Sequence, residues 1–259
     1  MSLRYVAARG GALVVGASSG IGAALARELA RRGYHVALVA RRAGELNALA
    51  GAITSAHGAN AARVYPHDVR DESQAPALFE RIAADLEGAG APLRLVVYSA
   101  GVMPRPGPDG WSFDDQRAMI EVNLLGAMRW LDLAAAYFAP RGSGVIVGVS
   151  SVAGDRGRRG NSAYMASKAG LSVYLESLRY RLASAGVRVV TVKPGFVDTP
   201  MLAGVKTPRA LTTAPQAIAR HIADAIPRGP EVVYTPWYWR AVMALVKLAP
   251  GAVMKRLAV

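Results

Sequence analysis

The chain of 259 residues is 52% hydrophobic and has no cysteine, so it can bury one large core and uses neither disulfides nor thiolate chemistry. Its arginines, which give a formal net charge of +13, are scattered along the chain and form no basic block with interleaved aromatics, so we expect no specific nucleic-acid partner. Residues 1–10 lack the apolar core of a signal peptide, and no apolar run reaches the ~20 residues of a membrane span, which predicts a cytoplasmic protein.

Seven apolar runs typical of strands follow one another along the chain, at residues 12–17, 35–40, 62–68, 93–101, 144–151, 187–195 and 231–236. Amphipathic stretches typical of helices, such as 21–32 and 73–86, lie between most of them. Because strands that alternate with helices form parallel sheets covered on both faces, we predict an α/β fold. It is a single domain, residues 1–259, of the doubly wound Rossmann type with about seven strands. Residues 236–259, rich in aromatic and basic side chains, predict a helical appendage.

A glycine-rich turn, VVGASSGIG at residues 14–22, joins the first predicted strand to the first predicted helix. Gly16 permits a tight turn, Gly20 lets a pyrophosphate approach, and Gly22 lets the helix pack closely on the sheet. The helix N-terminus offers free N–H groups and a favourable dipole to a phosphate. We therefore assign dinucleotide binding to the residues of this turn: Gly16, Ser18, Ser19, Gly20, Ile21 and Gly22.

The residues after the second predicted strand indicate which dinucleotide is bound. An acidic side chain there favours NAD(H), whereas a basic one pairs with the 2′-phosphate of NADP(H). This chain has Arg41 and Arg42, so we favour NADP(H), with Arg41 facing the phosphate and Ser18 and Ser19 as candidates to share it. NAD(H) is the alternative if both arginines are ordinary solvent-exposed side chains at the start of a helix and bind no phosphate.

A candidate proton-transfer site is formed by three residues at and beyond the end of the fifth predicted strand: Ser151, Tyr164 and Lys168. Tyr164 and Lys168 lie four apart at the start of a predicted helix, so they share one face about one turn apart. A free tyrosine titrates near pH ~10, and a neighbouring ammonium lowers its pKa by favouring the phenolate. Ser151 can hydrogen-bond a substrate carbonyl oxygen as charge develops on it. Taken alone, each residue also fits a structural role in helix packing, as a solvated charge or as a cap.

Seven motifs resemble those of the short-chain dehydrogenase/reductase family in order and spacing, over nearly the whole chain: GASSGIG, HDV with Asp68, SAG at 99–101, VNLLGA with Asn123, SSVAG, YMASK and KPGFVDT. The resemblance implies that Ser151 polarises the carbonyl and that Tyr164 is the acid in reduction and the base in oxidation. It implies that Lys168 binds the nicotinamide ribose and lowers the pKa of Tyr164. Asn123 would hold a water of the proton relay, and we assign no metal ligand.

The resemblance also implies cofactor contacts outside the glycine turn. Asp68 and Val69 would face the adenine, and Thr199 with the Pro194–Gly195 turn would hold the nicotinamide. The other contacts assigned to the cofactor are Ser99, Ala100, Gly101 and Val197, together with Tyr164 and Lys168.

Two positions depart from the family pattern. Val15 and Ser99 stand where the family has Thr and Asn, whose hydrogen bond ties the first strand to the fourth. Val15 cannot make that bond, so we expect this joint to depend more on packing.

The sequence says less about the part of the site that binds the substrate. Residues 200–215, apolar and punctuated by prolines, predict a mobile lid and a partly hydrophobic substrate. The stretch 151–171 and the C-terminal tail also resemble the polyprenyl-phosphoryl 2-keto-sugar reductases, which implies a lipid-linked ketone. We therefore predict an NAD(P)(H)-dependent oxidoreductase that moves a hydride between the nicotinamide and a carbonyl or secondary alcohol. The alternative is a catalytically silent dinucleotide-binding sensor or scaffold of the same fold.

Two surfaces predict partners beyond a small-molecule substrate. Helices around 124–137 and 167–182 have larger apolar faces than one sheet needs, and the resemblance implies that they pair, so we expect a homodimer or homotetramer. In the tail, 237–248 carries Arg240 and Lys247 on one helical face beside aromatic residues, and Lys255 and Arg256 follow. This pattern suits packing on the body or a neighbouring subunit, which we favour, or peripheral contact with the inner face of the membrane.

Overall fold

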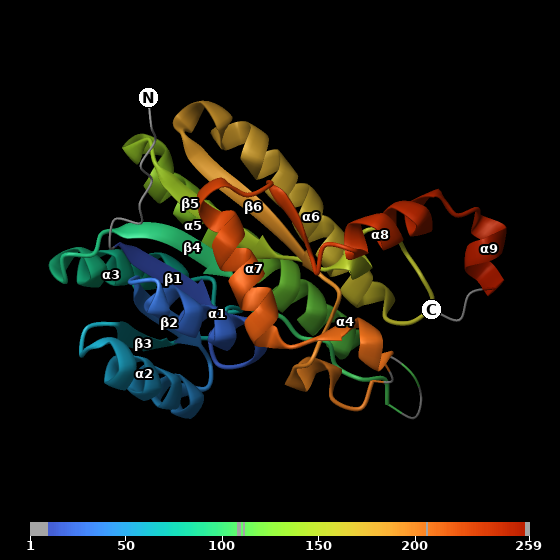
Figure 1. Ribbon diagram of the computed structural model, residues 1–259, viewed down its shortest axis with the longest axis horizontal. Coiled ribbons are helices and arrows are strands. Elements are labelled where there is room, and N and C mark those ends of the chain that lie inside the picture. The colour runs from blue at the N-terminus through green and yellow to red at the C-terminus, as the bar shows by residue number, and fades with distance from the viewer. Residues whose placement is uncertain (1–9, 108–109, 111, 206, 257–259) are drawn as a thin grey trace.

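The computed structural model describes residues 10–107, 110, 112–205 and 207–256. Its centre is a seven-stranded parallel sheet with the strand order β3-β2-β1-β4-β5-β6-β9 (Figure 1). The strands are β1 (Gly11–Val15), β2 (His35–Ala40), β3 (Ala62–Pro66), β4 (Leu93–Tyr98), β5 (Gly144–Val149), β6 (Val187–Pro194) and β9 (Val232–Thr235). Each lies in or at the edge of one of the seven predicted runs, and the α/β prediction is confirmed.

Helices cover both faces of the sheet, as the prediction of a doubly wound fold requires. The helices of the body are α1 (Gly20–Arg31), α2 (Ala43–His57), α3 (Ala75–Gly88), α4 (Phe113–Ile120), α5 (Gly126–Phe138), α6 (Ser162–Leu182) and α7 (Pro215–Arg228). Helices α1, α2 and α7 pack on one face, and α3, α5 and α6 pack on the other. Along β1, Ala12 and Val14 belong to the first core, and Leu13 and Val15 belong to the second. This double burial is why the strands read as continuous apolar runs.

The strand order reverses direction between β1 and β4, which are neighbours although two strands separate them in sequence. Ligands of open α/β sheets bind in the crevice outside the carboxyl ends of the strands at such a point. The joint here is closed by backbone pairing: the N–H of Ser99 donates to the carbonyl of Val15 at 2.8 Å, and Val15 is fully buried. Main-chain bonding and packing therefore hold the joint that Val15 cannot tie with its side chain.

The predicted lid has more structure than an open loop. Short 3-10 turns occupy Pro200–Leu202 and Arg209–Leu211, and β8 (Thr212–Thr213) pairs with β7 (Phe196–Val197). This two-stranded pairing fixes both ends of the lid beside β6. It was not predicted, because two-residue strands leave no pattern in a sequence.

The C-terminal appendage is helical, as predicted, and extends from one end of the body (Figure 1). Helix α8 (Trp239–Leu248) starts two residues later than expected, because residues 236–238 form a turn whose carbonyls accept the first helical N–H groups. A short helix α9 (Gly251–Arg256) follows. Within the described residues, no helix has the length and apolarity to cross a bilayer.

Candidate active site

The glycine turn brings the start of α1 against the end of β4. Gly16 has a φ of 91°, and a Cβ at this position would lie 2.3 Å from the backbone nitrogen of Ala100. A Cβ at Gly22 would lie 2.1 Å from the carbonyl oxygen of Gly16. Neither position can carry a side chain without moving the backbone, which explains two of the three glycines by close approach. The turn thereby places the N-terminus of α1 at the crevice between β1 and β4.

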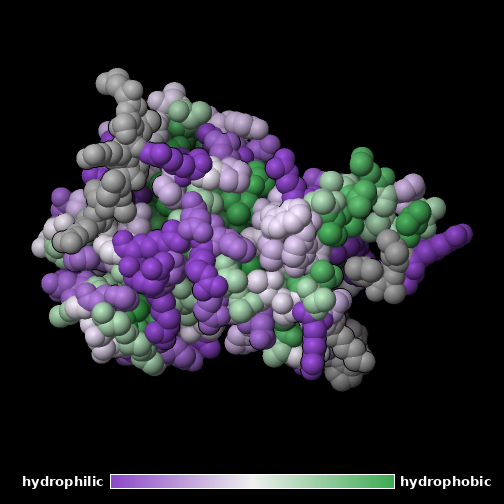
Figure 2. Space-filling view, viewed as in Figure 1, coloured by the Kyte–Doolittle hydropathy of each residue, from purple (hydrophilic) through white to green (hydrophobic). Residues whose placement is uncertain are grey.

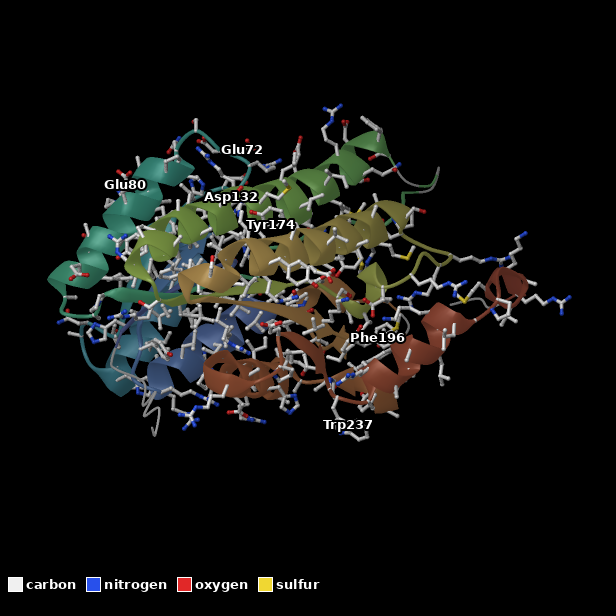
Figure 3. All side chains as sticks on the ribbon, turned by 90° about the horizontal axis from the view of Figure 1, so that it is seen from above. Glu72, Glu80, Asp132, Tyr174, Phe196 and Trp237 are labelled. Atoms are coloured by element: carbon white, nitrogen blue, oxygen red, sulfur yellow. The ribbon has the colours of Figure 1, made fainter. Side chains whose placement is uncertain are left out.

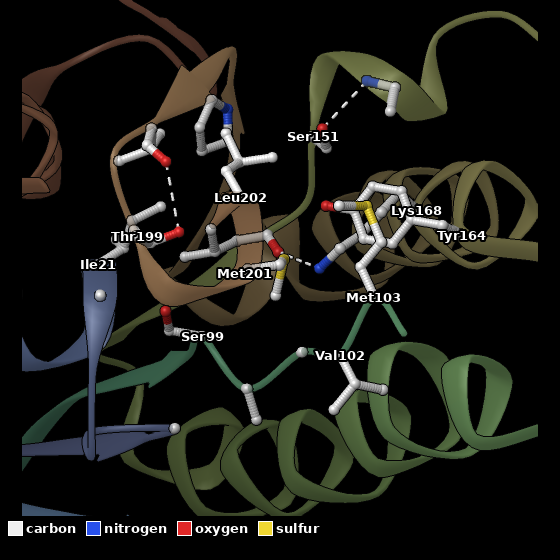
Figure 4. Close-up of a pocket in the computed structure, with 18 of the residues that line it drawn as sticks. Ile21, Ser99, Val102, Met103, Ser151, Tyr164, Lys168, Thr199, Met201 and Leu202 are labelled. Atoms are coloured by element: carbon white, nitrogen blue, oxygen red, sulfur yellow. Dashed lines mark hydrogen bonds between the residues drawn. The ribbon is translucent and has the colours of Figure 1, made fainter. Parts of the chain in front are cut away.

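A cavity of about 830 Å³ runs along the carboxyl ends of the strands. All residues assigned to the cofactor line it except Asp68, and Ser151 lines it as well. In Figure 4, Ser151, Tyr164 and Lys168 lie on one side of this cavity, Ile21 and Thr199 on the other, and Met201 between them. The residues singled out from separate parts of the sequence are thus brought together.

Arg42 lines the cavity next to the glycine turn and contacts several neighbouring side chains there. Its guanidinium donates to the hydroxyl oxygens of Ser18 and Ser19, both at 2.8 Å, and lies 3.3 Å from Glu45. Arg41 also lines the cavity, and its guanidinium lies 3.8 Å from the carboxylate of Asp68. The two serines and the two arginines therefore form one polar, cationic group at this end.

Asp68 is not among the residues that line the cavity, and its place against the adenine stays a prediction. Arg70 binds its carboxylate, with one guanidinium nitrogen at 2.7 Å, and this hydrogen bond lowers the pKa of Asp68. The pairing turns the carboxylate toward Arg70, two residues along the chain. The neighbours His67 and Val69 do line the cavity.

Tyr164, Ser151 and Lys168 meet at the junction of β5 and α6. Ser151 and Tyr164 line the cavity together, the hydroxyl of Ser151 accepts from the N–H of Ala153 at 3.1 Å, and the ammonium of Lys168 lies 5.9 Å from the centre of the Tyr164 ring. Lys168 donates to the carbonyl of Val149 at 3.0 Å, which fixes the amine below the end of β5. Asn161 caps α6 by accepting from the N–H of Tyr164, so the helix begins just before the tyrosine.

Burial determines the protonation of this group. Desolvation raises the pKa of Tyr164, while the interaction with the neighbouring Ser151 side chain acts in the opposite direction. Desolvation also lowers the pKa of Lys168 to about 8. Tyr164 therefore keeps its proton at neutral pH, which is the form that an acid needs. That the ammonium of Lys168 lowers the pKa of Tyr164 stays a prediction.

Asn123 lies on a π-helical turn, Glu121–Leu125, between α4 and α5, and its side chain is fully buried. Its amide nitrogen donates to the carbonyl of Val102 and to the hydroxyl of Ser167, and its oxygen accepts from the N–H of Val102 at 2.7 Å. The side chain thus ties the loop after β4 to α6 behind the cavity, which it does not line. Its role in holding a water stays a prediction.

Sequence reasoning missed several residues of the cavity wall: His67, Met103, Arg105, Arg158, Arg159 and Trp239. A signal for two of them was present, since the stretch DRGRRG between Ser151 and Tyr164 concentrates arginines in a loop that must pass the site. For Trp239 no local signal exists. Its side chain packs on Gly195, where a Cβ would lie 1.9 Å from the indole nitrogen.

The tail helices dock on the loop that follows Ser151. Trp239 and Met243 are buried and pack with Val152, and the Trp239 ring meets Phe196 edge-on at 5.4 Å. Arg156 donates to the carbonyls of Val246 and Lys247 at the end of α8, and Arg159 donates to the carbonyl of Lys255. Cations bound to the last carbonyls of a helix also complement its dipole. The favoured prediction, that one side of the tail packs on the body, is correct for this face.

Comparisons with known proteins agree with this geometry. The family model of the short chain dehydrogenases matches residues 11–210. An uncharacterized oxidoreductase of Myxococcus xanthus is 38% identical over 241 residues, which cover 93% of this chain and 92% of that protein. The cis-4-hydroxycyclohexanecarboxylate dehydrogenase of Sinomonas cyclohexanicum is 35% identical, with 83% of this chain and 86% of that protein covered.

Solved structures give the same result. A variant of the actinorhodin polyketide ketoreductase, crystallised with NADPH, is similar with a TM-score of 0.77 and 26% identity, over 89% of this chain and 97% of that chain. The span that the family model matches contains the glycine turn, Ser151, Tyr164 and Lys168. The chain therefore belongs to the short chain dehydrogenase family, as an oxidoreductase that acts on CH–OH and C=O groups with a nicotinamide dinucleotide.

Proposed function

We propose that the protein reduces a ketone with NADPH, or oxidises the matching secondary alcohol with NADP⁺, and that Tyr164 transfers the proton. The observation that carries the proposal is that Ser151, Tyr164 and Lys168 line one side of the same cavity, with the amine of Lys168 beside the Tyr164 ring. The relatives named above include a dehydrogenase of a secondary alcohol and a polyketide ketoreductase, and this supports the same reaction class here.

The residues divide the reaction between them. The bound nicotinamide supplies or accepts the hydride. In reduction, the hydroxyls of Ser151 and Tyr164 both donate hydrogen bonds to the carbonyl oxygen, and Tyr164 passes its proton to that oxygen as negative charge develops. The raised pKa of Tyr164 keeps this proton in place at neutral pH. Lys168, held by the carbonyl of Val149, stabilises the charge that forms on the tyrosine oxygen and is placed to bind the nicotinamide ribose.

The test compares two tyrosines of the same helix. Tyr164→Phe should abolish turnover of NADPH on a panel of ketones and leave NADPH affinity nearly unchanged, because only a transition-state contact is removed. Tyr180→Phe is the matched control, since Tyr180 is exposed on α6 and only bonds Glu176. If Tyr164→Phe keeps more than a few per cent of the activity, the assignment of the acid is wrong. If the unmodified protein binds NADPH but reduces no ketone and oxidises no alcohol, the silent-sensor alternative holds.

We also propose a preference for NADP(H) over NAD(H). The support is the cationic group at the glycine turn, in which Arg42 bonds both Ser18 and Ser19 while Arg41 lies beside it. These four side chains form a cluster of donors suited to a 2′-phosphate. Arg42 is the better-connected of the two arginines, whereas the sequence pattern suggested Arg41.

Binding measurements test this preference. Arg42→Ala and Arg41→Ala should each weaken NADPH by about 10–100-fold, corresponding to ~1.5–3 kcal/mol, with much less effect on NADH. Equal affinity of the unmodified protein for both cofactors would remove the argument, and tighter binding of NADH would reverse it.

The substrate is proposed to be partly hydrophobic, and a lipid-linked ketone fits this class. Apolar side chains from four segments line the cavity beyond the tyrosine: Val102 and Met103 after β4, Met165 on α6, Met201, Leu202 and Val205 in the lid, and Trp239 on α8. A ketone series of increasing chain length tests this proposal, because each buried methylene should add about 0.8 kcal/mol to binding until the cavity is filled. A KM independent of chain length would contradict it.

We further propose a homodimer or homotetramer that pairs α5 and α6. Leu125, Val173 and Tyr180 are exposed on this side, and Asp132 and Arg181 form an ion pair there. Figure 3 has Asp132 and Tyr174 close together on this outer face. A monomeric mass by light scattering at micromolar concentration would refute the pairing.

The outer side of the tail supports a peripheral membrane contact as a further proposal. Trp237, Leu245 and Leu248 are 79%, 72% and 82% exposed, and Arg240 and Lys247 are exposed on the same helix region. Trp237 points away from the body in Figure 3, and apolar residues gather over the tail in Figure 2. Aromatic and basic residues side by side suit an anionic lipid surface. Co-sedimentation with anionic vesicles, weakened by salt and abolished by Trp237→Ser with Leu245→Ser, is expected, and equal sedimentation with neutral vesicles would contradict it.

A further inference from the structure

The large cavity is lined by cations at both ends and by no carboxylate among the described residues. Arg41 and Arg42 follow β2, Lys168 lies in the middle, and Arg105, Arg158 and Arg159 line the part beyond Tyr164. The order of the strands separates the two ends, since β1 and β4 lie between β2 and β5 in the sheet. The arginines after β5 are therefore far along the sheet edge from the group proposed to hold the 2′-phosphate.

Most charged groups around Arg158 already have partners. Asp155 is 1% exposed and is bound by Lys193 and by the hydroxyl of Tyr234, so its charge is satisfied. Arg156 and Arg159 donate to carbonyls of the tail. The guanidinium of Arg158, by contrast, makes no hydrogen bond or ion pair within the part of the chain that the structure describes. It is half-buried, and burial lowers its pKa, while the charge of Asp155 acts in the opposite direction.

A second cavity continues from this point. Its volume is about 550 Å³, and it shares Arg158, Arg159 and Met165 with the large cavity. It lies between the loop after Ser151 and α9, and Arg156 and Lys255 also line it. No acidic residue lines it in the described part of the chain. The cavity lining that carries basic and no acidic side chains therefore extends from the neighbourhood of Tyr164 to the tail.

Arg105 adds a cation from the lid side. Its guanidinium lies against the backbone of Gly204, where a Cβ would be 2.6 Å from a guanidinium nitrogen. It has no ion pair with a described residue either. Arg105 is exposed, whereas a half-buried cation without a bonded partner, such as Arg158, is unfavourable in an isolated protein and becomes favourable when an anion shares its site.

We propose that the substrate carries an anionic oxygen group, a phosphate ester or a carboxylate, which Arg158 binds at the end of the cavity away from the 2′-phosphate group, with Arg105 as a second contact. The proposal rests on the proposed function, because it describes the ketone that Tyr164 reduces. An apolar segment of that substrate lies along Met103, Met165 and Trp239, and its charged end reaches the arginines. The substrate class is thus an amphiphilic, anionic ketone.

A binding experiment tests the anion site without turnover. Octyl phosphate, octanoate and octanol, below their micellar concentrations, are titrated by calorimetry into the protein saturated with NADP⁺, which occupies the site at Arg41 and Arg42. Octyl phosphate or octanoate should bind at least tenfold more tightly than octanol, and the stronger of the two identifies the anion. Arg158→Gln should remove most of this difference in affinity. Arg158→Lys should remove part of it, because lysine lacks the planar guanidinium that can bind an anion with two parallel hydrogen bonds.

The matched control is Arg209→Gln, which removes the same charge from an exposed position of the lid that does not line the cavity. It should bind octyl phosphate as the unmodified protein does. If Arg158→Gln and Arg209→Gln weaken the binding of octyl phosphate equally, the anion is attracted by the overall surface charge and not by a specific site, and the proposal is overturned. A similar loss of NADP⁺ affinity in Arg158→Gln would also overturn it, because the arginine would then serve the cofactor.

A kinetic comparison separates this proposal from the reaction itself. With a medium-chain oxo acid and its methyl ester as substrates, Arg158→Gln should lower kcat/KM at least tenfold for the acid and less than twofold for the ester. If neither ketone is reduced by the unmodified protein, the proposed function fails while the calorimetric result still decides the anion site. If acid and ester lose activity equally, the arginine does not recognise the charge.

Discussion

The buried ion pair of Asp155 gives the sharpest test of how the active-site loop is held. Asp155 lies four residues after Ser151, and its carboxylate is bound by Lys193 at the end of β6 and by the hydroxyl of Tyr234 on β9 at 2.7 Å. The side chain of Asp155 is 1% exposed and that of Lys193 is 14% exposed. The carboxylate and burial together raise the pKa of Tyr234. We therefore expect Asp155→Asn to leave Lys193 as an uncompensated cation in the interior.

The magnitude follows from burial. Removing one partner of a buried ion pair destabilises a protein by about 3–5 kcal/mol, because the other charge stays buried without compensation. For a domain of this size each 1 kcal/mol shifts Tm by about 2–4 °C, so Asp155→Asn should lower Tm by about 6–20 °C. Asp224→Asn is the matched control. It breaks the 2.6 Å pair between Asp224 on α7 and Arg32 after α1, whose side chains are 67% and 26% exposed, so the expected loss is at most about 1 kcal/mol.

Thermal unfolding followed by circular dichroism measures both variants. The double variant Asp155→Asn with Lys193→Met should recover much of the lost stability, because replacing a buried pair by apolar groups is often neutral. Equal Tm shifts for Asp155→Asn and Asp224→Asn would refute the reasoning from burial. A double variant no more stable than Asp155→Asn would show that the lost hydrogen bonds, not the stranded charge, set the magnitude.

Three further outcomes are expected. Because Lys168 loses its proton as the pH rises through about 8, kcat/KM for ketone reduction should fall there. Lys168→Arg should move this fall to higher pH, and a pH profile of kcat/KM that is flat up to pH 10 would contradict the prediction. Gly22→Ala should sharply weaken NADPH binding because its Cβ meets the carbonyl of Gly16, whereas Gly51→Ala, with open space around it, should not change the affinity measured by fluorescence titration. Trp239→Ala should destabilise the protein by about 3–5 kcal/mol in urea unfolding, and a loss below 1 kcal/mol would show that α8 is not anchored there.

The sequence predicted the sheet well because its strands are buried on both faces. Runs such as Val36–Ala40 and Val145–Val149 contain hardly any polar residue, so their pattern survives without knowledge of the packing. The site was equally accessible, since parallel strands end at one edge and motif residues placed just after strands must gather there. Ser151 and Tyr164, thirteen positions apart, meet for this reason.

Contacts between distant segments could not be predicted in the same way. The space that Gly195 leaves is filled by Trp239, forty-four residues later, and nothing around either residue reports the other. Asp68 shows a local contact that its motif did not reveal: Arg70, two residues along the chain, binds its carboxylate. The side chain of Asn123 is likewise committed to Val102 and Ser167, which only the folded chain reveals.

The loop between Ser151 and Tyr164 distributes its charged residues in a way that favours recognition by Arg158. Asp155 fixes the loop to β6 and β9, while Arg156 and Arg159 fix it to the tail helices. Arg158 is therefore held on both sides by anchored neighbours, and its own guanidinium is left for a ligand. Because the loop is already ordered, binding an anion costs less conformational entropy than it would on a free loop. The two sets of predictions are therefore linked: Asp155→Asn, where it remains folded, should weaken the binding of octyl phosphate as Arg158→Gln does, whereas Asp224→Asn should leave that affinity unchanged.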